Sequence, residues 1–124
     1  MVKEQQNEDP DFTTVEFPNP ENPLAFEYAL RYGKKHDADI LMATDPDADR
    51  LAIMVKTKNG DFKFMTGNQT AALMISYILS SRKDRGLLPS NGAMIKSIVT
   101  GELGDEIAET YGVTMFETLT GFKN

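Results

Sequence analysis

The chain has 124 residues, 40% of them hydrophobic, and a formal net charge of −6. This length and composition predict one folded domain with its own core and exclude wholesale disorder. The acidic balance, without a Lys/Arg cluster, predicts no nucleic-acid partner. No apolar run approaches the ~20 residues that span a bilayer, so we expect no membrane partner. The chain has no cysteine, which excludes disulfides and thiolate metal sites and fits a cytoplasmic protein.

The first predicted elements are a lead-in and a helix. Residues 1–22 are polar and rich in proline, which predicts an extended lead-in segment with one short strand near Thr13–Phe17. Asn22 can cap free N–H groups and Pro23 suits the first helical position. Apolar residues then recur at helical spacing, so we expect a helix that ends near His36.

Two strands and a tight turn follow. The run Asp39–Thr44 is short and apolar, which predicts a strand buried on both faces, as in a parallel sheet. The loop Asp45–Arg50 follows it directly, and Leu51–Thr57 predicts the second strand. Asn59-Gly60 is a strong hairpin signal and requires an antiparallel pair with a third strand at Phe62–Met65.

The second half of the chain alternates helices and strands. Thr66-Gly67-Asn68-Gln69 resembles a capping box, and the helix that it opens is apolar nearly all round, so we expect it to be well buried up to about Arg82. A strand at Ala93–Val99, a helix at Glu102–Tyr111 and a strand at Val113–Leu119 complete the pattern. This alternation predicts a three-layer α/β domain.

Three aspartates stand at alternate positions of one loop. Asp45, Asp47 and Asp49 directly follow a predicted buried strand, at the edge where open α/β sheets place ligands. Carboxylates this close repel one another unless a cation lies between them. Oxygen-only ligands favour a hard cation, either magnesium or calcium.

Other kinds of acidic loop fit less well. An EF-hand needs Gly at its sixth position and Glu at its twelfth, where this chain has Arg50 and Lys56. An aspartyl phosphatase usually has a hydroxyl or apolar residue where Asp49 stands, and its hydrolysis would be lost when Asp45 is changed. A solvated acidic turn is the remaining alternative, and a strand on each side argues against it.

The loop and its flanking strands read ATDPDADRLAIMV, and this sequence resembles the metal loop of the alpha-D-phosphohexomutase superfamily. Three further segments are similar to that family: Glu16–Glu21 (EFPNPE), Phe64–Gln69 (FMTGNQ) and Glu117–Lys123 (ETLTGFK). The chain therefore looks like the second, metal-binding domain of a phosphoglucomutase/phosphomannomutase. With this assignment, residues 1–22 are a lead-in segment, 23–119 are domain II, and 120–124 begin the linker to a third domain.

The resemblance implies a fold and a site. The fold would be an α/β/α sandwich with a mixed, mostly parallel sheet of about four core strands, besides the antiparallel hairpin. Asp45, Asp47 and Asp49 would hold Mg²⁺. Arg50 would contact phosphate, although a salt bridge with its own aspartates is an equal alternative. Thr120-Gly121 would contact the sugar in the full enzyme.

The implied reaction interconverts hexose 1-phosphate and hexose 6-phosphate through a phosphoserine enzyme and a sugar bisphosphate. Its partners would be the sugar phosphate and the other domains of the same chain. No serine here is followed by His-Asn-Pro, the family's nucleophile context, so we expect an excised domain without turnover. A phosphopentomutase, a sugar-bisphosphate synthase and a non-catalytic acidic metal-binding module remain as alternatives.

Overall fold

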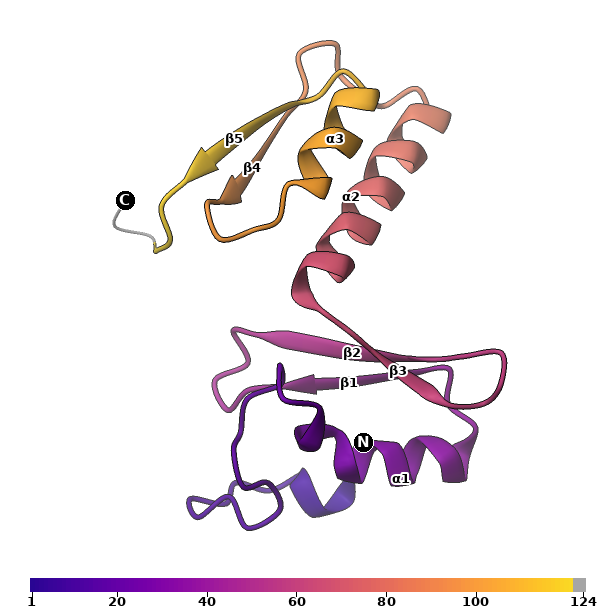
Figure 1. Cartoon of the computed structure of the whole chain (residues 1–124), viewed down its shortest axis with the longest axis vertical. Helices are drawn as coiled ribbons and strands as arrows, with labels where there is room; N and C mark the ends of the chain where they lie inside the picture. Colours follow the sequence, from indigo (N-terminus) through magenta and orange to yellow (C-terminus); the bar gives the residue numbers. More distant parts are fainter. Residues whose placement is uncertain (122–124) are drawn as a thin grey trace. The chain divides into compact units, whose positions relative to one another are not determined.

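The computed structural model describes residues 1–121 (Figure 1). Its contacts divide the chain into two compact units, Met1–Gly67 and Asn68–Asn124, called unit 1 and unit 2 below. Each unit has its own cluster of buried apolar side chains. The expected single domain over residues 23–119 is therefore not what the structure shows, because the apolar residues on either side of Gly67 bury themselves in separate clusters.

The N-terminal segment of unit 1 consists of turns and a short 3-10 helix, η1 (Lys3–Gln5). The strand expected at Thr13–Phe17 is absent from this described segment, so that prediction was wrong. The carboxylate of Asp9 accepts hydrogen bonds from both the backbone N–H and the hydroxyl of Thr13. Local bonds of this kind compete with a strand ladder and hold the backbone in a turn.

The predicted helix start at Asn22 is confirmed. A 3-10 turn, η2 (Pro23–Phe26), leads into α1 (Glu27–His36), and Asn22 Oδ1 accepts a hydrogen bond from the N–H of Leu24 at 3.1 Å. Phe26 has no exposed surface and meets the ring of Phe64 edge to face, with ring centroids 5.9 Å apart. This contact fastens the start of the helix to the sheet.

The sheet of unit 1 is antiparallel throughout, in the order β1 (Ile40–Thr44), β2 (Leu51–Lys56), β3 (Phe62–Met65). The β2–β3 hairpin confirms the prediction from Asn59-Gly60. The prediction of a parallel strand buried on both faces was wrong for β1. Leu41 is buried on the side of α1, whereas the neighbouring side chain of Met42 points to the other face and is 67% exposed.

Unit 2 contains α2 (Gly67–Asp84), β4 (Ala93–Ser97), α3 (Leu103–Thr110) and β5 (Thr114–Thr118). The two strands are parallel, with Lys96 opposite Glu117 in the register. Leu79, Ala108 and Val113 form the buried cluster of this unit. The helices α2 and α3 lie on the same side of β4 and β5 (Figure 1). The expected helix–strand alternation in this half of the chain is thus confirmed.

The helix α2 is less buried than its apolar sequence predicts. Ala72 and Leu79 lie in the unit core, but Met74 is 57% exposed and Tyr77 is 70% exposed. Only one side of an apolar helix can face the neighbouring helix and sheet, so the remaining apolar side chains stay in contact with solvent.

The α/β class predicted from the sequence is confirmed. The strands are distributed over an antiparallel sheet of three and a parallel sheet of two, instead of one mixed sheet. Among residues 1–121, none of the helices combines the length and apolar character needed to span a bilayer.

Candidate metal centre

The aspartate-rich loop joins two adjacent antiparallel strands. Its ends are fixed by the pairing of Thr44 with Leu51, the last residue of β1 and the first of β2. Ala48 donates its N–H to the carbonyl of Asp45 at 3.1 Å and has a positive φ of 56°. This left-handed conformation is costly for alanine and reverses the chain within the loop. The loop is therefore a hairpin connection between two antiparallel strands: the strand predicted on each side of it is present, and the parallel sheet expected for the first strand is not.

The hairpin brings the three predicted ligands together. One carboxylate oxygen from each of Asp45, Asp47 and Asp49 lies within 4.8 Å of the others. Asp45 is buried, whereas Asp47 and Asp49 are exposed. The cluster thus has one carboxylate fixed in the protein and two that face solvent.

Arg50 orients the buried carboxylate. Its backbone N–H donates to Asp45 Oδ1 at 3.0 Å and its Nε donates to Asp45 Oδ2 at 2.7 Å. The same Nε lies 3.7 Å from Asp49 Oδ1. The salt bridge with its own aspartates, one of the two roles considered for Arg50, is therefore present in the structure.

The electrostatics of the loop reflect an excess of negative charge: three carboxylates and one guanidinium give a formal charge of −2. Burial raises the pKa of Asp45, but the hydrogen bonds from Arg50 outweigh it and lower this pKa to about 2. The pKa of Asp49 is raised by its hydrogen bond with Asp45 and by the charges of Asp47 and Asp45. The repulsion within the cluster therefore falls on an exposed carboxyl group, where a cation has access.

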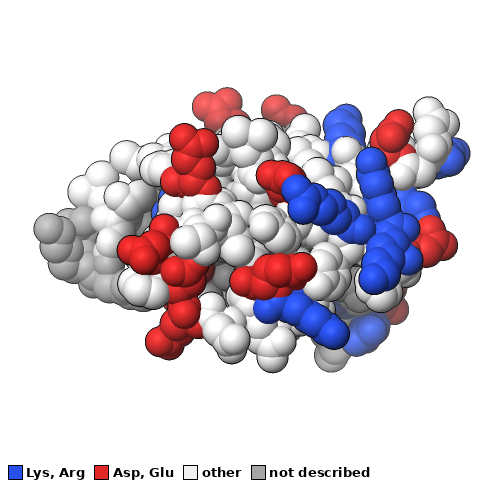
Figure 2. Space-filling model, turned by 90° about the horizontal axis from the view of Figure 1, so that it is seen from below, with Lys and Arg blue, Asp and Glu red and all other residues white. Residues whose placement is uncertain are grey.

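A hollow of about 950 Å³ within unit 1 adjoins the loop and lies between the N-terminal segment and the end of β1. Its lining includes the carboxylate residues Glu4, Glu8, Asp9 and Asp45 and no lysine or arginine. In Figure 2 the basic side chains lie mainly on the right of the face shown, while acidic side chains are spread over its centre and left and also stand among the basic ones. The hollow favours cations over phosphate groups.

The other predicted site residues belong to unit 2. Thr120 and Gly121 follow β5 after one residue, Leu119, and Gly121 has a φ of +96° that favours glycine. Phe122 and Lys123, which complete the ETLTGFK segment, lie outside the described residues. Within the described chain the acidic loop and Thr120-Gly121 are thus features of different units.

One polar cluster was missed by the sequence analysis. Lys96, next to the last residue of β4, has a side chain that is only 5% exposed and that contacts Asp105 and Glu117. The available signal was a lysine inside a short, otherwise largely apolar strand, since lysine is almost never fully buried unless paired. The sequence analysis also missed a contact of Asn68, whose side chain accepts a hydrogen bond from the N–H of Gly101 at 3.0 Å.

Matches to protein-family models divide the chain into two parts. A family model for phosphoglucomutase/phosphomannomutase alpha/beta/alpha domain II matches residues 1–68, and the model for domain III of the same family matches residues 66–124. The division falls beside Gly67, where the contacts also divide the chain. The assignment of residues 23–119 to domain II, with a linker at 120–124, is corrected accordingly.

Two curated relatives match nearly the whole chain. A phosphoglucomutase of Staphylococcus haemolyticus is 36% identical over 124 residues, which cover 100% of this chain and 22% of the relative. A phosphoribomutase of Saccharomyces cerevisiae is 40% identical over a match of 126 residues. This match covers 98% of this chain and 20% of the relative. The chain therefore spans about a fifth of the length of these relatives.

A solved structure shares the fold. It is a phosphoglucomutase/phosphomannomutase family protein from Burkholderia thailandensis, with a TM-score of 0.62 at 20% sequence identity. The match covers 84% of this chain and 20% of that one. At this level of identity the likeness concerns the fold alone.

Proposed function

The chain belongs to the phosphoglucomutase/phosphomannomutase family, and from this membership we propose that its acidic loop binds Mg²⁺ in an enzyme that interconverts hexose 1-phosphate and hexose 6-phosphate. The observation that carries the proposal is the convergence of three carboxylate oxygens, from Asp45, Asp47 and Asp49, within 4.8 Å. The lack of cysteine in the sequence fits a cytoplasmic location for this enzyme.

The donor set suits the proposed ion. Carboxylate oxygens are hard ligands, and Mg²⁺ holds them at about 2.1 Å, so two oxygens on one ion are at most about 4.2 Å apart. The three oxygens lie within 4.8 Å of one another, so at most a slight closing of the loop would bring them onto one ion. Asp45 is already fixed by Arg50, so we expect the exposed Asp47 and Asp49 to make most of this movement.

The four charged residues of the loop have proposed roles. Asp45, Asp47 and Asp49 would hold the cation, which would supply charge neutralisation to phosphoryl oxygens beside it. Arg50 orients Asp45 through its Nε. We also assign Arg50 a phosphate contact, because a guanidinium is a planar, permanently charged donor that can contact an aspartate and a phosphoryl oxygen together.

The sugar contact is assigned to Thr120 and Gly121. They follow β5 in the region that matches domain III, at the carboxyl end of a parallel strand, where open α/β sheets bind ligands. A pentose phosphate is the second candidate substrate, because a relative 40% identical to this chain is named phosphoribomutase. Comparing kcat/KM for glucose 1-phosphate and ribose 1-phosphate in the enzyme that contains this chain would separate the two.

We expect the 124-residue chain alone to show no mutase turnover, since it lacks a serine in the Ser-His-Asn-Pro context. The assay supplies glucose 1-phosphate, glucose 1,6-bisphosphate and Mg²⁺ and measures glucose 6-phosphate. Turnover above a contamination control would contradict the assigned roles. A non-catalytic metal-binding module would show metal binding here and no activity in any longer protein.

The metal proposal is tested by titrating Mg²⁺ into the chain and following backbone amide signals by NMR. We expect the signals of residues 44–51 to move first, with a dissociation constant in the high-micromolar to millimolar range, on the order of that of weak carboxylate sites. Asp47→Asn should weaken binding because it removes one charge and keeps the shape.

The matched control is Asp61→Asn, which removes an exposed carboxylate from the other hairpin turn of the same sheet. It should leave the Mg²⁺ titration unchanged. The metal assignment is wrong if Mg²⁺ leaves residues 44–51 unchanged, or if both variants weaken its binding equally.

A further inference from the structure

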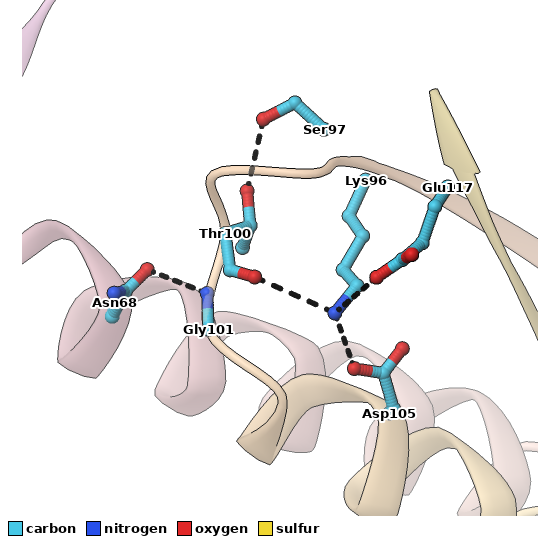
Figure 3. A network of polar contacts seen from close by, with 7 residues as sticks. All are labelled: Asn68, Lys96, Ser97, Thr100, Gly101, Asp105 and Glu117. Carbon is cyan, nitrogen blue, oxygen red and sulfur yellow. Dashed lines mark hydrogen bonds and ion pairs between the residues drawn. The ribbon is translucent and has the colours of Figure 1, made fainter. Parts of the chain in front are cut away.

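The buried ammonium of Lys96 joins three separate elements of unit 2 (Figure 3). It donates to the carboxylate of Asp105 in α3, contacts Glu117 Oε1 in β5 at 3.1 Å, and lies 3.4 Å from the carbonyl oxygen of Thr100 in the loop after β4. An ammonium has three donors, and these contacts occupy all of them.

The cluster lies beside the loops that leave the parallel strands. Ile98, the residue after β4, donates its N–H at 2.9 Å to the carbonyl of Thr118, the last residue of β5. The Thr100 hydroxyl lies 3.1 Å from the hydroxyl of Ser97. Two Thr-Gly pairs, Thr100-Gly101 and Thr120-Gly121, therefore follow two neighbouring parallel strands at the same edge of the sheet.

The loop after β4 is held from its other side by α2. Asn68 accepts the N–H of Gly101 at 3.0 Å, and a Cβ on Gly101 would lie 3.3 Å from the side chain of Asn68. Figure 3 shows Thr100 and Gly101 between Asn68 and Lys96, so this short loop has a fixed contact on each side. Its backbone shape is thus set by two side chains outside the loop.

Core filling alone does not account for a lysine at this position. Taking an ammonium out of water is unfavourable, and apolar side chains of similar size often replace buried ion pairs without loss of stability. The bonds with Asp105 and Glu117 raise the pKa of Lys96 against the effect of burial, so the side chain stays charged. The particular property of a buried ammonium is that it fixes several acceptors at defined positions.

We infer that Lys96 is a positioning residue: with Asp105 and Glu117 it fixes the loop Ile98–Gly101 and the end of β5, and so presets the edge where Thr120-Gly121 would meet a sugar phosphate. The sugar contact rests on the proposed function. The positioning of the loop by Lys96 does not depend on that function, and separate measurements test the positioning and the sugar contact.

The experiment compares three variants of the 124-residue chain by amide hydrogen exchange and thermal unfolding. Lys96→Met removes the ammonium and leaves two carboxylates unpaired. The triple variant Lys96→Met/Asp105→Asn/Glu117→Gln also removes these charges. It therefore separates the loss of the ammonium contacts from the effect of unpaired carboxylates. Lys56→Met is the control, because it removes a lysine that pairs with Asp37 in unit 1.

We expect exchange at the amides of Ile98, Thr100 and Gly101 to accelerate about tenfold or more in both Lys96 variants, since local opening no longer breaks the ammonium contacts. The triple variant should recover most of the unfolding midpoint while its loop exchange stays fast. Lys56→Met should leave these amides unchanged. If the triple variant restores both the midpoint and slow exchange, Lys96 serves only to neutralise two carboxylates and the inference is overturned.

A milder variant covers the case in which Lys96→Met does not fold. Glu117→Gln changes a side chain that is 56% exposed and removes one charged acceptor of the ammonium. Exchange at Ile98 should accelerate in this variant, and an unchanged rate would contradict the inference.

A second measurement tests the ligand. Glucose 6-phosphate is titrated into the wild-type chain and into the triple variant, and the amides of Thr120 and Gly121 are followed. Weaker binding in the triple variant at a recovered unfolding midpoint supports preset geometry, with a loss of up to about 100-fold for a misplaced contact. If the wild type shows no response at these amides, the proposed sugar contact fails, and the exchange result still decides the role of Lys96.

Discussion

The two units contain charged clusters of opposite design. In unit 1, three aspartates share one arginine, and the exposed Asp49 has a raised pKa because of its hydrogen bond with Asp45 and the like charges of Asp47 and Asp45. In unit 2, one lysine satisfies two carboxylates and a carbonyl oxygen inside the protein. The first cluster has two exposed carboxylates that a cation from outside could reach, and we propose that it binds one, whereas in the second the ammonium lies inside the protein and each of its donors has an acceptor. Clustered charge is thus a candidate ligand site where its charged groups face solvent, and a structural contact where they face one another.

Among the variants considered, we expect Lys96→Met to lower the free energy of unfolding most. Removing one partner of a buried ion pair leaves an uncompensated charge, which costs about 3–5 kcal/mol. We expect less, about 2 kcal/mol, because the carboxylates left behind are 34% exposed in Asp105 and 56% exposed in Glu117. Urea unfolding followed at NMR signals of unit 2 measures it. Lys56→Met, at a more exposed pair in unit 1, should cost no more than about 1 kcal/mol.

The next effect belongs to the acidic loop. At a Mg²⁺ concentration about ten times the dissociation constant, binding to the folded state alone should stabilise it by about 1.4 kcal/mol. Asp47→Asn should reduce this gain, and Asp61→Asn should preserve it. Urea unfolding at NMR signals of unit 1, with and without Mg²⁺, gives the measurement. A gain of equal size in both variants would mean that the ion acts elsewhere.

The acidic loop should also respond to acid. The folded pKa of Asp45 is lowered to about 2 from 3.8, so its contribution to stability is present above about pH 4 and is lost as the pH falls toward 2. The raised pKa of Asp49 acts in the opposite direction and penalises its ionised form. Mg²⁺ should lower the pKa of Asp49, because a bound cation favours the carboxylate. Carboxyl ¹³C titrations with and without Mg²⁺ measure both groups, and an unchanged Asp49 would argue against the site.

Local signals in the sequence predicted local structure well. Asn22-Pro23 marked the helix start, Asn59-Gly60 the hairpin, and the alternating aspartates a cluster that the structure confirms as three converging carboxylates. These features depend on neighbours within a few residues, whose backbone preferences and hydrogen bonds are written in the sequence itself.

Long-range arrangement could not be predicted in the same way. The apolar run at Ile40–Thr44 is compatible with a parallel or an antiparallel strand, because direction depends on which strand pairs with it. Burial of α2 depends on how many of its faces have a neighbour. The salt bridge between Lys96 and Asp105 joins residues nine positions apart across a strand–helix connection, so their spacing in the sequence did not reveal it.

The smallest effect concerns the backbone of the acidic loop. Ala48 has a φ of 56°, and the left-handed conformation costs a residue with a Cβ about 1–2 kcal/mol. Ala48→Gly removes this cost but gives the unfolded chain more freedom, worth about 0.4–1 kcal/mol, so unit 1 should gain about 0.5 kcal/mol. The same freedom in the folded loop should weaken Mg²⁺ binding slightly, because Asp47 and Asp49 flank the substituted residue. The control is Ala43→Gly in β1, where φ is not positive and glycine should destabilise by about 0.5–1 kcal/mol. Urea unfolding and Mg²⁺ titration of both variants measure these effects. If Ala48→Gly destabilises unit 1 as much as Ala43→Gly does, the loop does not hold its aspartates in a strained turn.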